Sequence, residues 1–147
     1  MALDEKQSLR LEIDSKLANT TLIAMAVRGL CTMTVLSPVE INRLELCLVE
    51  VVNNSIEHAY GNKSGSPVSV QVDLMKASIS ITVCDWGIVM PAEVLATDDQ
   101  QAIDPDVPES WLCSGRGLHI VKNLMDTVEY SSHEGRNSLL MTKLLRH

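Results

Sequence analysis

The chain has 147 residues, of which 46% are apolar and 21% charged, and this length is enough for one independently folding domain. Its formal net charge of −7 provides no basic stripe for a nucleic-acid backbone and no basic face for an anionic membrane. The first residues lack a secretory signal, no apolar run is long enough to cross a bilayer, and the four cysteines include no Cys-x-x-Cys pair. We therefore expect one cytoplasmic domain over residues 1–147, with reduced cysteines.

The first part of the chain contains one strand pattern followed by two helical patterns. Apolar and polar residues alternate over Ser8–Ile13, which predicts a half-buried strand. Asp14 or Ser15 is placed to cap the helix that follows. The next helix begins at Ser37–Glu40, where a capping serine, a first-turn proline and a glutamate three residues on occur together. Its apolar spacing continues to about Tyr60.

The second part of the chain predicts two hairpins separated by a long loop and a short helix. Val68–Leu74 and Ser78–Val83 alternate as the two strands of a hairpin, with the branched side chains on the core face. Residues 86–114 are irregular, and a loop of that length is usually functional or disordered. A helix from Gly117 and a hairpin over residues 127–145 follow. This order predicts an α+β two-layer sandwich, with a mixed, mostly antiparallel sheet covered on one face by helices.

The second long helix carries a polar row. Glu50, Asn54 and His58 are four residues apart, so their side chains share one side of the helix. A carboxylate one turn from a carboxamide can orient a nucleophile or take its proton, and an amide oxygen is a suitable ligand for Mg²⁺. The alternative is a solvated polar face without a chemical role.

A second candidate feature is the end of the 78–83 strand, where Asp85 is followed by Gly87. An aspartate at a strand end can accept a hydrogen bond from the amino group of adenine. A glycine two residues later leaves room for a flat ring beside the backbone. The alternative is an ordinary turn, in which both residue types are common.

A third candidate feature is the glycine pair Gly115 and Gly117, which immediately precedes a helix. Backbone N–H groups at such a helix start can bind phosphate, and Arg116 could add a forked contact. The segment lacks the sequence of a P-loop, and the alternative is a glycine-rich helix start without a ligand.

In this order, the E-x-x-x-N helix, the strand-end D-x-G and the G-x-G-L motif resemble the N, G1 and G2 boxes of the GHKL ATPases. The sequence resembles most closely the bacterial anti-sigma-factor serine kinases, whose fold is the Bergerat-type sandwich. The marks of that group are Glu50–Tyr60, Gly115–Val121, Leu124–Val128 and Met141–Lys143, and the resemblance covers nearly the whole chain.

The resemblance implies a site for ATP or ADP with Mg²⁺. Glu50 is then the general base and Asn54 the Mg²⁺ ligand beside the phosphates. Asp85 takes the adenine amine, with Gly87 under the ring. The residues expected at the phosphates are Gly115, Arg116, Gly117 and Leu118, and loop 88–114 is expected to close over them. His58 is expected to be a packed or capping residue.

The resemblance further implies a kinase that phosphorylates a serine of a small antagonist protein and sequesters a sigma factor, and homodimers are common in the family. A nucleotide-dependent binding module without catalysis is the main alternative, because it needs the same pocket. The catalytic domain of a histidine kinase is disfavoured, since residues 15–33 contain no histidine. A structural domain without a ligand would require the three motifs to occur in this order by chance. Ile88–Pro91 departs from the family pattern, which leaves retention of kinase activity open.

Overall fold

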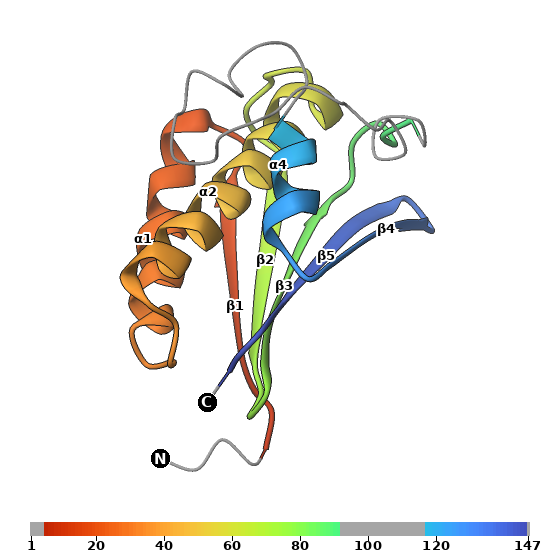
Figure 1. The fold of residues 1–147 in the computed structure, drawn as a ribbon. Coiled ribbons are helices and arrows are strands. Elements are labelled where there is room, and N and C mark those ends of the chain that lie inside the picture. The colour runs from red at the N-terminus through yellow and green to blue at the C-terminus, as the bar shows by residue number, and fades with distance from the viewer. Residues whose placement is uncertain (1–4, 92–116, 147) are drawn as a thin grey trace.

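The computed structural model describes residues 5–91 and 117–146, which form a five-stranded sheet with helices on one face (Figure 1). The sheet order is β1-β2-β3-β5-β4. The strands are β1 Gln7–Asp14, β2 Pro67–Leu74, β3 Ser78–Asp85, β4 Thr127–His133 and β5 Arg136–Leu144. The α+β sandwich is thus confirmed. Every pairing between these described strands is antiparallel, whereas a mixed sheet was expected.

The helices lie side by side across that face, with α2 between α1 and α4 (Figure 1). They are η1 Leu17–Asn19, α1 Thr20–Cys31, α2 Pro38–Asn54, η2 Ser55–Ala59 and α4 Gly117–Leu124. The start of α2 is the predicted capping box. The Ser37 Oγ accepts a hydrogen bond from the Glu40 N–H at 3.2 Å, and the Glu40 Oε1 accepts one from the Ser37 N–H at 3.0 Å.

The core lies between the helices and the sheet. Each apolar residue predicted on the inner face of the β2–β3 hairpin is buried: Val68, Val70, Val72, Leu74, Ile79, Ile81 and Val83. They pack with the apolar stripe of α2, where Leu48 and Val52 are fully buried. The alternating apolar residues of the strands and the apolar stripe of the helix therefore pack together in one core.

The start of the first helical region differs from the sequence expectation. Neither Asp14 nor Ser15 caps a helix, and no side chain caps η1 or α1. Instead, Asp14 accepts a hydrogen bond from the Gly65 N–H at 3.0 Å. Ser15 donates to the Lys63 carbonyl at 2.6 Å and accepts from the Ser66 N–H at 3.1 Å. The loop before β2 supplies these polar groups with partners, so tertiary contacts replace the predicted cap.

The end of α2 also differs from a simple α-helix. The α-helix ends at Asn54, and a π-helical turn follows in η2, where the Tyr60 N–H donates to the Ser55 carbonyl at 3.1 Å. The Tyr60 hydroxyl donates to the Pro67 carbonyl at 2.7 Å and accepts from the Trp86 N–H at 2.8 Å. These two hydrogen bonds connect the end of the helix to β2 and β3. Such wide turns are frequent at functional sites.

The described cysteines are free thiols, as expected. Burial raises the pKa of Cys31 to about 11 and that of Cys47 to about 12, so both stay protonated and unreactive at neutral pH. Cys113 lies outside the described residues. Within the described ranges, no helix has the length and apolarity to cross a membrane, and no group of three or more metal-ligating side chains occurs.

Candidate nucleotide-binding site

A cavity of about 610 Å³ lies between the C-terminal part of α2, η2 and the ends of β3, β4 and β5. Its size falls within the range of about 300–1,000 Å³ that is usual for small-molecule sites. Four of the predicted site residues line it: Glu50, Asn54, Asp85 and Leu118. Gly117 begins α4 directly before Leu118. Gly115, Arg116 and most of loop 88–114 lie outside the described residues.

Asp85 is a buried polar residue of this cavity with two described hydrogen-bond donors. It is buried, and its Oδ1 accepts hydrogen bonds from Asn137 Nδ2 at 2.7 Å and from the Gly87 N–H at 3.1 Å. Asn137 Nδ2 also donates to the Gly87 carbonyl at 3.0 Å. Among the described residues nothing donates to Asp85 Oδ2. A carboxylate oxygen that lines a cavity and has no protein donor can accept a hydrogen bond from a ligand amine.

Asn137 is a site residue that the sequence reasoning missed. The asparagine is buried, lines the cavity and accepts a hydrogen bond from Ser132 Oγ at 2.8 Å. In the sequence it is one residue of the hairpin predicted over residues 127–145. The available signal was the strand register, because β3 and β5 pair Asp85 with Asn137.

The absence of a side chain at Gly87 has a structural cause. A Cβ there would come within 2.6 Å of the Ala59 carbonyl carbon and 2.9 Å of the Ala59 Cβ, and closer still to the carbonyl oxygen. The Ile88 N–H donates to that same carbonyl oxygen at 2.9 Å. Gly87 therefore lets the segment after β3 pack directly on η2, whereas the sequence suggested room for a flat ring.

Glu50 lies one turn before Asn54 on the cavity wall and is half-buried. Burial raises the pKa of the Glu50 carboxyl, and the neighbouring negative charge of Glu57 raises it further. A carboxylate whose pKa is raised toward neutrality is better suited to accept a proton than an ordinary surface glutamate. No described side chain donates a hydrogen bond to Glu50 or Asn54, so both can face a ligand.

His58 was expected to be a packed or capping residue. It is exposed on the cavity lining, so it is not packed, and no described side-chain hydrogen bond caps η2. Ile88–Pro91, which departs from the family pattern, forms an apolar part of the same lining. Its position is held by the Met90 N–H, which donates to the Tyr130 hydroxyl at 2.9 Å. The cavity thus combines an apolar wall with a few polar groups, as sites for flat ligands do.

The comparisons with known proteins show the family of the chain. The family model described as "Histidine kinase-like ATPase domain" matches residues 13–143. The sequence is 26% identical over 140 residues to the anti-sigma F factor of Clostridium beijerinckii, covering 95% of this chain and 94% of that protein. It is 24% identical over 141 residues to the serine-protein kinase RsbW of Listeria innocua, covering 93% of this chain and 87% of that protein.

Two solved structures share the fold. The RsbU and RsbW domains of a Mycobacterium tuberculosis protein match with a TM-score of 0.64 and 16% identity, over 96% of this chain and 33% of that chain. The SiaB–SiaC complex of Pseudomonas aeruginosa matches with a TM-score of 0.60 and 14% identity, over 92% of this chain and 89% of the matched chain. The chain belongs to the histidine kinase-like ATPase domain family, and its curated relatives are anti-sigma factors and serine-protein kinases.

Proposed function

We propose that this protein is an ATP-dependent serine kinase that phosphorylates a small antagonist protein and sequesters a sigma factor or similar regulator in a partner switch. One observation carries the proposal: a single cavity gathers a half-buried carboxylate (Glu50), a carboxamide one turn away (Asn54) and a buried carboxylate at a strand end (Asp85). The names of the curated relatives support the class of reaction and the class of partner.

Nucleotide binding is assigned to the sheet side of the cavity. Asp85 Oδ2 is available to accept a hydrogen bond from the adenine amino group, while Asn137 holds Oδ1. The apolar run Ile88–Pro91 offers a surface for the base. Asn54 would hold Mg²⁺ by its amide oxygen together with phosphate oxygens, and the metal would supply positive charge at the phosphates. Gly117 and Leu118 belong to the helix start assigned to the phosphate end.

Phosphoryl transfer is assigned to Glu50. Its carboxylate accepts the proton of the acceptor serine as the serine oxygen bonds to the terminal phosphorus of ATP, and the bond to ADP breaks. The raised pKa of Glu50 fits a group that must hold this proton transiently. Asn54 and the glutamate act from one helix, so their spacing is fixed by the backbone of α2.

Two substitutions separate binding from chemistry. Asp85→Asn keeps the acceptor for Asn137 and replaces Oδ2 by a donor, so a calorimetric titration of Mg·ATP is expected to show a large loss of affinity. Glu50→Gln is expected to bind Mg·ATP like the wild type but to transfer phosphate about 10²–10⁴-fold more slowly.

Transfer is read by phosphate-affinity electrophoresis with a candidate antagonist protein. Binding without any transfer by the wild type would favour the non-catalytic binding module. Normal transfer by Glu50→Gln would remove Glu50 from the assigned role. Unchanged Mg·ATP affinity in Asp85→Asn would contradict the assignment of the cavity.

A further inference from the structure

A second cavity, of about 310 Å³, lies between the two N-terminal helices. Helix α2 and η2 supply one wall through Glu45, Val49, Asn53 and Glu57, and Thr20 and Thr21 of α1 belong to the other. The four residues on the first wall recur every four positions, so they form one row. The volume is at the lower end of the range of about 300–1,000 Å³ for ligand sites, which leaves room for a few side chains of a partner.

Helix α2 and the η2 turn that continues it separate this cavity from the nucleotide site. The row from Glu45 to Glu57 faces the second cavity, and the adjacent row, which contains Glu50 and Asn54, faces the first. Asn53 and Glu57 line both cavities. The two spaces are therefore neighbours that meet at the end of the helix, beside the group assigned to proton transfer.

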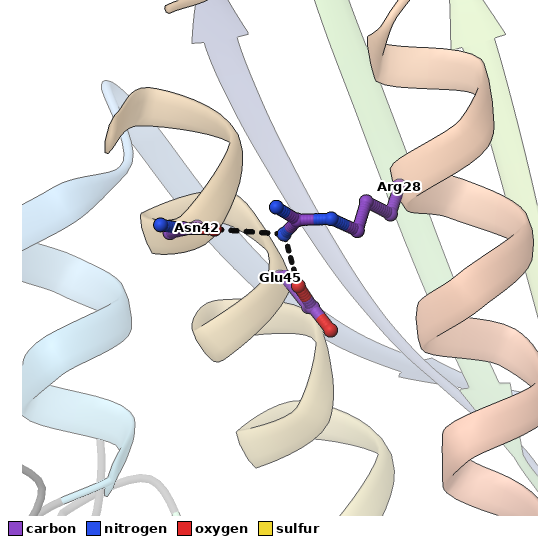
Figure 2. Close-up of polar contacts among 3 residues, drawn as sticks. All are labelled: Arg28, Asn42 and Glu45. Carbon is purple, nitrogen blue, oxygen red and sulfur yellow. Dashed lines mark hydrogen bonds and ion pairs between the residues drawn. The ribbon is translucent and has the colours of Figure 1, made fainter. Parts of the chain in front are cut away.

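The charges along the row are not equivalent. Arg28 Nη1 donates to Glu45 Oε2 at 2.6 Å and to Asn42 Oδ1 at 2.8 Å, so the charge of Glu45 is compensated (Figure 2). Glu57 is exposed and forms no ion pair with a described residue. Thr20 Oγ1 donates to Asn53 Oδ1 at 2.8 Å and joins the two walls. Among the described residues, nothing therefore compensates the negative charge at the end of the groove that adjoins the nucleotide site.

We propose that this groove, which we call the acceptor groove, holds the serine-bearing segment of the phosphorylated partner, with a lysine or arginine of the segment against Glu57 and its serine directed at Glu50. The inference rests on the proposed kinase function. Three features of the groove favour this occupant. In the proposed function ATP occupies the first cavity, so the serine needs a separate approach to Glu50, and the groove adjoins the first cavity at Asn53 and Glu57. A cation complements Glu57, and Leu17 and Val49 add apolar surface for a neighbouring side chain.

The preference for a basic residue is tested with synthetic peptides. A library of short peptides with a fixed central serine and randomised flanks is incubated with the full chain and Mg·ATP, and the phosphorylated peptides are sequenced. Lysine and arginine are expected to be enriched at one or two fixed positions. A matched pair of peptides, with lysine or glutamate at that position, is expected to differ about tenfold in kcat/KM.

Charge reversal at Glu57 tests whether this residue determines the preference for a basic peptide. Glu57→Lys is expected to invert the lysine-to-glutamate preference. The ratio between the two peptides is the readout, because both are measured at the same ATP concentration and any effect of Glu57 on the nucleotide cancels. A ratio that stays as in the wild type would overturn the assignment to Glu57.

The groove itself is tested by filling it. Thr21 is exposed on the groove wall, and Thr21→Arg places a long cation there. We expect about a tenfold loss of kcat/KM for the lysine peptide, with an unchanged affinity for Mg·ATP. Met25→Arg is the matched control, because Met25 lies on the same helix, is 53% exposed and lines neither cavity. It is expected to behave like the wild type.

The outcomes distinguish the two proposals. Serine phosphorylation without a basic preference, or with equal effects of Thr21→Arg and Met25→Arg, would overturn the acceptor groove and leave the kinase function standing. Absence of phosphorylation across the library, with transfer to an intact antagonist protein retained, would overturn the acceptor groove alone. Absence of transfer to both the peptides and the intact antagonist would contradict the kinase function, and the acceptor groove with it.

Discussion

Glu50 combines a role in the proposed chemistry with a cost to the folded state. Its pKa is raised by burial and by Glu57, so the folded protein binds a proton at this site more tightly than the unfolded chain does. The ionised carboxylate is consequently unfavourable in the folded state. This penalty is absent below the ordinary carboxyl pKa, grows as the pH rises from that value through the raised pKa, and is complete above the raised pKa.

The substitution Glu50→Gln is therefore expected to increase the free energy of unfolding at pH 7 while it slows phosphate transfer. The gain should shrink as the pH falls toward the ordinary glutamate range of about 4. Urea denaturation of both proteins across this range measures it. Glu129→Gln, at an exposed position on β4, is the control and is expected to change stability by less than about 0.5 kcal/mol. A loss of stability at pH 7 in Glu50→Gln would contradict the sign of the argument.

At the scale of single residues, local spacing predicted part of the site. Glu50 and Asn54 share a wall because an α-helix places residues four apart on one side. Asn137 could not be found in this way, since its contact with Asp85 spans 52 positions and depends on the β3–β5 register. His58 was misjudged because spacing shows which side of a helix a residue occupies but not how much of it neighbouring segments cover.

At the scale of elements, the contact between η2 and the segment after β3 decides the shape of the nucleotide site. Gly87 and Ala59 approach so closely that a Cβ at position 87 would displace one backbone from the other. The same approach carries the hydrogen bond from the Ile88 N–H to the Ala59 carbonyl. Both segments line the cavity, so a separation here changes the relative positions of Asn54 and Asp85.

Gly87→Ala is expected to lower the free energy of unfolding by about 1–3 kcal/mol, the usual cost of overpacking, and to weaken Mg·ATP binding. Gly29→Ala is the matched control. Gly29 lies within α1, with nothing within 4 Å of the added Cβ, so this change is expected to stabilise the protein by about 0.5–1 kcal/mol. Urea denaturation and calorimetry measure both effects. Equal stability of the two variants would show that the close contact with Ala59 is not limiting.

Element boundaries were predictable where the signal was local and failed where a distant segment competed. The start of α2 was read from Ser37–Glu40, and its capping box is present. The cap expected from Asp14 or Ser15 is absent because the loop at 63–66 takes their hydrogen bonds. The π-helical turn at η2 accompanies the Tyr60 hydrogen bonds to β2 and β3, which no local pattern encodes.

At the scale of the whole molecule, the net charge of −7 acts on the two proposed substrates in opposite directions. Mg·ATP is itself negative, so the protein repels it at long range, whereas a basic acceptor segment is attracted. Salt screens both interactions, because the Debye length falls from about 30 Å at 0.01 M to about 10 Å at 0.1 M. Raising the salt over this interval is therefore expected to lower the KM for Mg·ATP and to raise the KM for the lysine peptide.

Two charge-removing variants distinguish the effect of a charge near the site from the effect of the net charge on the salt dependence of KM. Glu57→Gln removes a charge at the junction of the two cavities, and it is expected to flatten the salt dependence for the lysine peptide. Glu5→Gln removes the same charge before β1, whose first residues pair with the end of β2 that is remote from Asp85. This variant should keep most of the salt dependence. The strand register places its charge at the far end of the sheet from the site, and salt screens an interaction over that distance. A rise of both KM values with salt would show instead that cationic groups close to the phosphates outweigh the charge of the molecule as a whole.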